Sequence, residues 1–227
     1  MTFRTWGGKR KGAGRKPRGG RRNVSRRTRP ALAARHPVLV TQRVRRELGT
    51  LRSKRSYRAI RAAFVEGCRR DGFRVVQYSV QRDHIHLIAE ASDAVQLARG
   101  MQGLSIRIAR ALNRALGRTG RVFADRYHAR ALTTPRQVRN AVAYVANNVR
   151  HHTARYGLPR DYVDPCSSWA YFDGWRARIG RRQVAARVGR APVAPPRTWL
   201  LRVGWRRHGL VRIDEIPGRV ATRRPHP

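Results

Sequence analysis

The chain has 227 residues, with 52 Lys and Arg against 12 Asp and Glu, which gives a formal net charge of +40. This length suits one domain with extensions, and a hydrophobic fraction of 41% is enough to form a core. The composition therefore excludes a chain that is only a disordered basic tail. So large a positive charge repels itself unless a polyanion neutralises it, which favours nucleic acid as the partner over a small acidic metabolite.

The sequence contains no run of 18 apolar residues, which excludes a transmembrane helix. No apolar stretch follows the basic N-terminus, as a secretory signal would require. Cys68 and Cys166 lie far apart and form no Cys-x-x-Cys pair, so neither a zinc ribbon nor a disulfide scaffold is expected. We therefore expect a reduced, cytoplasmic protein with no membrane partner.

Residues 1–35 are predicted to be a disordered basic tail. Their basic residues alternate with six glycines, and no acidic residue occurs before Glu47. Within the tail, residues 12–19 (GAGRKPRG) look like an AT-hook, in which Arg15 and Arg18 would enter a narrow minor groove of DNA. The alternative is a solvated tail that binds phosphates without sequence preference.

Downstream of the tail, runs of β-branched residues alternate with amphipathic helical patterns. In chain order we expect a strand at 37–44, a helix capped by Ser56 and running to about 70, strands at 73–80 and 84–90, a helix at 93–116, a strand at 122–132 and a helix from 135 to about 155. This order predicts an α+β domain over residues 36–157. Its fold would be a ferredoxin-like split βαβ unit, with an antiparallel sheet and an added C-terminal helix.

Residues 158–227 are predicted to be a C-terminal extension rich in Trp, Arg and Pro. Trp199 and Trp205 stand among arginines, a composition typical of surfaces on which bases stack. The alternative is that Trp199 and Trp205, together with Trp169 and Trp175, cover the preceding domain.

The sequence His84-Ile85-His86 lies in the expected strand at 84–90. Side chains two residues apart in a strand leave the same face, so the two imidazoles point together. Paired imidazoles can bind a divalent metal with a third ligand from elsewhere, although most such pairs in strands are incidental. Asp83 precedes the pair, where it could orient an imidazole or simply form a turn.

The last expected helix carries Tyr144 and Asn148, which are four residues apart and so share a face. A tyrosine that reaches a metal site can act as a nucleophile on a phosphodiester whose phosphate the metal polarises. Taken alone, Tyr144 is better explained as an amphipathic residue that lines the core.

Taken together, the His-Ile-His strand, the element order and the Tyr-x-x-x-Asn helix resemble the HUH single-tyrosine (IS200-like) transposases. Within that family the sequence is similar to the REP-associated tyrosine transposases, the bacterial branch linked to repeated palindromic elements. Residues 120–130 (GRVFADRYHAR) resemble the family's G-x-x-F-x-x-R-Y/F strand, and residues 144–148 (YVANN) resemble its Y-I-x-x-N-P. Val149 stands where the family often has proline. The resemblance covers about residues 37–157.

The resemblance implies a metal-dependent enzyme that cleaves and rejoins single-stranded, hairpin-forming DNA. His84 and His86 would bind Mg²⁺ or Mn²⁺, and Asn148 would stand where the family has a further ligand. Tyr144 would attack the scissile phosphate, which leaves a 5′-phosphotyrosine link and a free 3′-OH. Since none of these ligands is charged, we expect metal binding to be coupled to DNA binding.

Two further arginines are candidate DNA contacts: Arg126 in the expected strand at 122–132, and Arg150 near the end of the last helix. A solvated surface position is the alternative for Arg126. The sequence does not decide between a monomer and a homodimer that exchanges the tyrosine helix. A cytoplasmic protein associated with the bacterial nucleoid is expected from its DNA partner.

Two other functions stay open at this point. One is a non-catalytic DNA-binding or architectural protein on the same fold, and the other is a basic RNA-binding protein. The presence of both histidines and of Tyr144 favours the enzyme, because neither alternative requires these residues at these positions.

Overall fold

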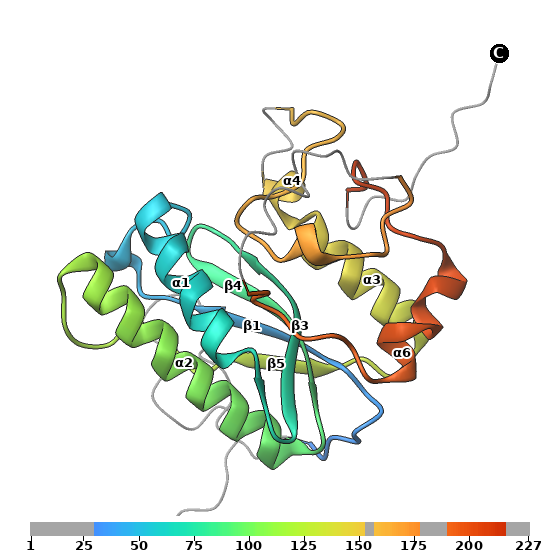
Figure 1. Ribbon diagram of the computed structural model, residues 1–227, viewed down its shortest axis with the longest axis horizontal. Coiled ribbons are helices and arrows are strands. Elements are labelled where there is room, and N and C mark those ends of the chain that lie inside the picture. The colour runs from blue at the N-terminus through green and yellow to red at the C-terminus, as the bar shows by residue number, and fades with distance from the viewer. Residues whose placement is uncertain (1–29, 153–156, 178–189, 217–227) are drawn as a thin grey trace, which may run out of the picture.

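The computed structural model describes residues 30–152, 157–177 and 190–216. They form a five-stranded sheet with a layer of helices and loops on each face (Figure 1). The AT-hook-like segment, with Arg15 and Arg18, lies outside the described residues.

The sheet has the order β2-β3-β4-β1-β5, and every pair of neighbouring strands is antiparallel. Its strands are β1 (Val38–Arg43), β2 (Arg69–Arg70), β3 (Phe73–Val80), β4 (His84–Ala91) and β5 (His128–Ala131). Apart from the two-residue β2, this is the strand order of a ferredoxin-like split βαβ unit. The predicted α+β class is therefore confirmed.

Two helices cover each face of the sheet (Figure 1). On one face lie α1 (Lys54–Gly67) and α2 (Ala94–Leu116), and on the other lie α3 (Pro135–Ala146) and the short α4 (Asn148–His152). Along β4, Ile85 and Leu87 pack in the core with α1 and α2, whereas Ile88 packs in a second core with α3. Because both faces are covered, β3 and β4 are buried along almost their whole length.

The C-terminal extension completes the layer on the α3 side. It contains α6 (Trp199–Arg202) and the 3₁₀ helices η2 (Trp169–Tyr171) and η3 (Gly204–His208), while a third 3₁₀ helix, η1 (Arg46–Leu48), follows β1. Trp169, Trp175 and Trp205 are buried in the core that includes α3, so these three tryptophans cover the preceding domain. Trp199 is different, because 49% of it is exposed.

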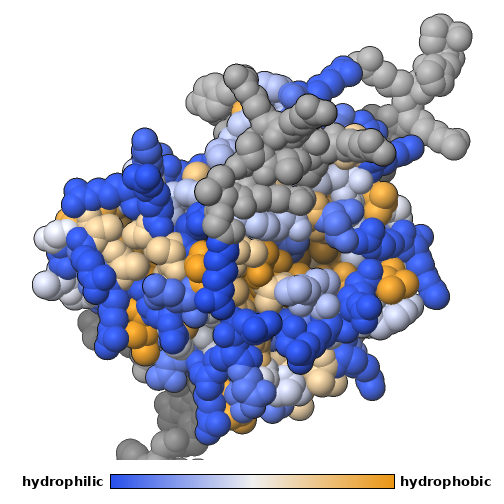
Figure 2. All heavy atoms as spheres, viewed as in Figure 1, coloured by the Kyte–Doolittle hydropathy of each residue, from blue (hydrophilic) through white to orange (hydrophobic). Residues whose placement is uncertain are grey.

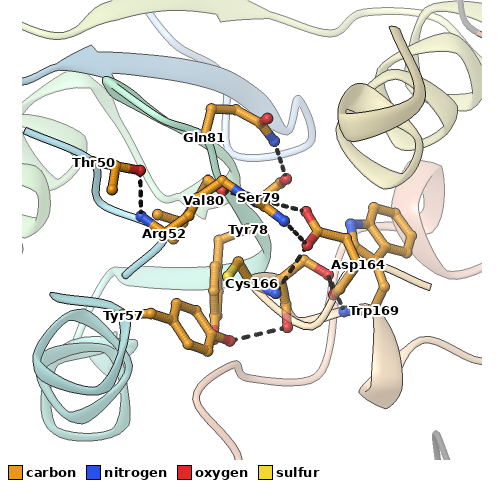
Figure 3. Close-up of polar contacts among 11 residues, drawn as sticks. Thr50, Arg52, Tyr57, Tyr78, Ser79, Val80, Gln81, Asp164, Cys166 and Trp169 are labelled. Atoms are coloured by element: carbon orange, nitrogen blue, oxygen red, sulfur yellow. Dashed lines mark hydrogen bonds and ion pairs between the residues drawn. The ribbon is translucent and has the colours of Figure 1, made fainter. Parts of the chain in front are cut away.

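The extension also covers the outer edge of β3. Backbone N–H groups of Val80 and Ser168 donate across this edge to the carbonyls of Cys166 (2.9 Å) and Tyr78 (3.0 Å). Behind the edge, the buried carboxylate of Asp164 accepts two hydrogen bonds from Arg52 (Figure 3). A strand edge that would otherwise offer unpaired backbone groups is thereby closed by the protein's own chain.

Four expected boundaries were wrong. The helix expected to run to about residue 70 ends at Gly67, and Arg69 and Arg70 form β2 instead. The N-cap of α1 is Ser53 and not Ser56, because the Ser53 hydroxyl accepts a hydrogen bond from the Ser56 N–H at 3.1 Å. The strand expected at 122–132 is reduced to β5, since Phe123 forms only an isolated bridge and the chain then leaves the sheet. The last helix is interrupted at Asn147, whose φ of −107° and ψ of 17° end α3 before α4 begins.

On the face seen in Figure 2, hydrophilic side chains lie around the rim and apolar side chains are concentrated toward the middle. Part of the apolar surface is a groove between α1 and α2 that is floored by alanines, including Ala59, Ala62 and Ala111, and bordered by basic residues. No helix within the described ranges is long and apolar enough to cross a bilayer.

Candidate active site

The candidate site begins at the first residues of β4, where His84 and His86 leave the same face of the sheet. The Nε2 atoms of the two rings lie 2.9 Å apart, and the rings meet edge to face with 4.6 Å between their centroids. Both histidines are buried. Two imidazole nitrogens therefore converge on one point, as a metal-binding histidine pair requires.

The other nitrogen of each ring is held by a neighbouring side chain. His84 Nδ1 lies 2.7 Å from Asp83 Oδ1, and His86 Nδ1 lies 3.0 Å from Thr41 Oγ1 on β1. Burial acts to raise the pKa of the Asp83 carboxyl, but the hydrogen bond with His84 and the nearby Arg43 outweigh it, so this pKa is lowered. Partners of this kind fix the ring orientations and turn both Nε2 atoms to the same side. Asp83 therefore occupies the orienting position considered above.

Tyr144 reaches this histidine pair from α3, the helix that packs on the face of the sheet from which the two imidazoles project. Its helix, α3, begins with Thr134 as N-cap, whose hydroxyl accepts from the Gln137 N–H at 3.2 Å, and has Pro135 in its first turn. Near the end of α3, the Tyr144 hydroxyl lies 3.4 Å from His86 Nε2, and the two rings meet edge to face at 5.0 Å. The structure thus brings together three residues that are separated by up to 60 positions in the sequence.

Asn148 lies one turn beyond Tyr144, just after the helix interruption. It is fully buried, and neither atom of its amide group has a hydrogen-bond partner among the described residues. A buried amide in this condition is costly unless something else satisfies it. The structure gives Asn148 no hydrogen bond to either histidine, so its place as a ligand stays a prediction.

These donors fit a divalent cation. Among the described residues no group of three His, Cys, Asp or Glu side chains is arranged to hold a metal ion, so the two imidazoles would need a further ligand, for which the Asn148 amide stays the candidate. Imidazole nitrogens bind transition metals well, and an amide oxygen suits Mg²⁺ or Mn²⁺. Three neutral donors also leave coordination positions for the oxygens of a phosphate.

A pocket of about 530 Å³ lies next to His84. It is lined by Arg46, Gly49, Gln81, Arg82, Asp83 and His84. Arg46 and Arg82 are exposed, and both can reach a phosphate that enters this pocket. No local pattern marks these two arginines, because only the fold places the turn after β1 beside the turn before β4.

The two described arginines expected to bind DNA have different surroundings. Arg126 is exposed and precedes β5 rather than lying within a strand. Arg150 is buried, and its guanidinium donates to backbone carbonyls of the extension. Arg126 therefore stays a candidate DNA contact, whereas the expectation for Arg150 was wrong because the protein's own backbone surrounds it.

Thr41 is a further residue at this site that sequence reasoning missed. It faces His86 across the β1–β4 pairing and His128 across the β1–β5 pairing, so these three residues share one face of the sheet. No local pattern marks Thr41, because its contact with His86 depends on the register of two strands that are far apart in the sequence.

A family model matches the chain, and two solved structures are similar to it. The family model described as "Transposase IS200 like" matches residues 33–148, just over half of the chain. A solved REP-associated tyrosine transposase bound to a REP hairpin has 18% sequence identity and a TM-score of 0.49, with 76% of this chain and 93% of that chain covered. A crystal structure of a candidate transposase from Deinococcus radiodurans R1 has 14% identity and a TM-score of 0.37, with 49% and 86% covered. No curated protein matches the chain.

Proposed function

The chain belongs to the family of IS200-like transposases, and we propose that it cleaves and rejoins single-stranded DNA through a covalent link to Tyr144. The observation that carries this proposal is the Tyr144 hydroxyl, 3.4 Å from Nε2 of the buried His86. A phenol beside two imidazoles that can bind a metal is placed to attack a phosphate held at the same point. An incidental histidine pair would require neither this tyrosine nor the partners on both Nδ1 atoms.

His84 and His86 would bind Mg²⁺ or Mn²⁺, with Asn148 as the candidate third ligand. When bound, such a cation supplies Lewis-acid polarisation of the scissile phosphate. Because all three protein donors are neutral, we expect tight cation binding only when DNA phosphate oxygens add negative charge.

In the cleavage step, Tyr144 Oη attacks the phosphorus, and the bond from phosphorus to the 3′ oxygen breaks. The phenol proton passes to solvent and the departing 3′ oxygen takes up a proton, which leaves a 5′-phosphotyrosine and a free 3′-OH. A 3′-OH from a second junction then attacks the phosphotyrosine, joins the strands and restores the tyrosine. Each step exchanges one phosphate ester for another, so the chemistry requires no nucleotide cofactor.

DNA is the partner that the charge favours. Arg46 and Arg82 border the pocket next to His84, and Arg126 is exposed ahead of β5. The solved REP-associated transposase is bound to a REP hairpin. We therefore propose hairpin DNA as the first substrate to test for this chain. We also propose that the chain belongs to the REP-associated branch of the family. Arg15 and Arg18 are proposed as minor-groove contacts, and association with the bacterial nucleoid would follow from DNA binding.

The test incubates the full chain with end-labelled single-stranded hairpin oligonucleotides and Mn²⁺, beside Tyr144→Phe and EDTA controls. We expect an SDS-resistant protein–DNA band that is lost in both controls. Salt-sensitive binding with no such band, across a varied pool of oligonucleotides, would favour a non-catalytic DNA-binding protein. Equal binding to RNA, unchanged by substitution of His84, His86 or Tyr144, would favour the RNA-binding alternative.

A further inference from the structure

We propose that Arg150 is a positioning residue, which holds Tyr144 at the histidine pair by tying α4, the short helix directly after the tyrosine helix α3, to the C-terminal extension. This inference rests on the proposed role of Tyr144 as the nucleophile. On this inference, the segments at 158–162 and 209–215 support catalysis indirectly, because they hold the helix that carries Tyr144, and they need not touch DNA.

The guanidinium of Arg150 is enclosed by the extension's own backbone. Only 8% of the residue is exposed. Its nitrogens donate to the carbonyl oxygens of Ile213 (2.7 Å), Pro159 (2.6 Å), Arg160 (3.1 Å), Tyr162 (3.2 Å) and Leu158 (3.5 Å). A planar group with five N–H donors can reach carbonyls of both backbone segments at once, whereas the compact ammonium of a lysine, with three N–H donors, cannot replace all of these hydrogen bonds.

Two further side chains, one on the tyrosine helix α3 and one at its C-cap, bind the extension. Asn147 Nδ2 donates to the carbonyl of Arg212 at 3.0 Å. At the other end, Arg139 makes two hydrogen bonds of 2.8 Å to the Glu215 carboxylate and one of 2.9 Å to the carbonyl of Gly209. Tyr144 therefore lies between an anchor five residues before it and anchors three and six residues after it.

Tyr144 packs against the core beside α3, but its contacts with the histidine pair are few, so its place there depends on where its helix is held. The described contacts to the site are one at 3.4 Å from its hydroxyl and one ring contact, both to His86. α3 ends at Ala146, within one turn of Tyr144, and α4, which carries Arg150, begins directly after Asn147. The Arg150 N–H donates to the Asn147 carbonyl at 2.9 Å, so the position of α4 constrains the end of α3. A displacement of about 1 Å at a reacting group can cost about 100-fold in rate.

The experiment compares the full-length wild type with Arg150→Lys and Arg150→Gln. Arg136→Gln is the matched control, since Arg136 is an exposed arginine on the first turn of the tyrosine helix α3. Three quantities are measured: the rate of adduct formation at saturating hairpin DNA and Mn²⁺, the DNA dissociation constant at several salt concentrations, and amide hydrogen exchange over residues 135–152. All three are measured well below the melting temperature of each variant.

We expect both Arg150 variants to form the adduct about 100-fold more slowly, with DNA affinity within about twofold of wild type, and the control to behave as wild type. Hydrogen exchange should rise at 141–150 while β4 keeps its protection. If Arg150 instead contacted phosphate, Arg150→Gln would weaken binding and flatten its salt dependence, while Arg150→Lys would not. A lower melting temperature with an unchanged adduct rate would also overturn the inference.

The proposed function and this inference fail in different ways. If the wild type forms no Tyr144 adduct with any hairpin, the nucleophile assignment fails, and hydrogen exchange still tests the anchor. Unchanged exchange at 141–150 in Arg150→Lys would refute the anchoring role whatever the activity.

Discussion

Replacement of Asp164 by alanine should destabilise the protein strongly, because this carboxylate joins the extension to the edge of the sheet. Its side chain is fully buried and accepts from Arg52 at 2.7 and 2.9 Å and from the Cys166 N–H at 2.9 Å (Figure 3). Without it, Arg52 loses its carboxylate partner and keeps neutral partners such as the carbonyl of Val80, although 77% of its side chain is removed from solvent.

Removal of one partner from a buried ion pair costs about 3–5 kcal/mol. For a chain of this length, about 2–4 °C of melting temperature is lost per kcal/mol, so Asp164→Ala should melt about 6–20 °C lower. Differential scanning calorimetry of the full chain measures this shift. The matched control is Asp173→Ala, which removes the ion pair between Asp173 and Arg206. The side chain of Asp173 is 84% exposed and that of Arg206 is 36% exposed. An exposed pair is worth about 0–1 kcal/mol, so the control should melt within about 4 °C of wild type.

A double-mutant cycle separates the ion pair from the packing around it. Arg52→Met with Asp164→Leu removes both charges, and we expect this double variant to recover much of the stability that either single variant loses. If Asp164→Ala melts no lower than Asp173→Ala, the extension is not bound to the sheet in the way described.

Three further predictions follow from single contacts. Thr41→Val removes the partner of His86 Nδ1 and should weaken Mn²⁺ binding in the presence of DNA about 10–100-fold, as measured by isothermal titration calorimetry. Gly100→Ala should lower stability by about 1–3 kcal/mol in urea unfolding, because its Cβ would meet the Phe73 ring at 2.1 Å. A mixture of Tyr144→Phe and His86→Ala proteins should form no adduct, since each tyrosine lies at the histidine pair of its own chain. An adduct from that mixture would show a tyrosine helix exchanged between subunits.

Local signals were enough to predict most of the fold. The bounds of β3 agree with expectation because Asp71-Gly72 forms the turn before it, with Gly72 at a φ of +65° that suits glycine. The helix at 93–116 agrees as well, since Asp93 caps it with a hydrogen bond from the Gln96 N–H at 2.7 Å. In both segments the residues that fix the boundary are neighbours in the sequence.

Features that depend on distant pairing could not be predicted. The contact of Thr41 with His86 needs the register of β1 against β4. The burial of Arg150 needs the carbonyls of 158–162 and 213, and no local pattern brings those segments to α4. Only the family resemblance joins Tyr144 to His84 and His86 as one site. The distances of 2.9 Å between the two Nε2 atoms and 3.4 Å from His86 Nε2 to the Tyr144 hydroxyl are consistent with that resemblance.

The central claim is that Tyr144 becomes covalently bound to DNA. The most direct test digests the SDS-resistant adduct formed with hairpin DNA and Mn²⁺ by protease and nuclease, and then locates the nucleotide-bearing residue by tandem mass spectrometry. The account predicts a 5′-phosphate ester on Tyr144 alone. A nucleotide on another residue, such as Tyr127, or a wild-type protein that yields no modified peptide, would contradict it.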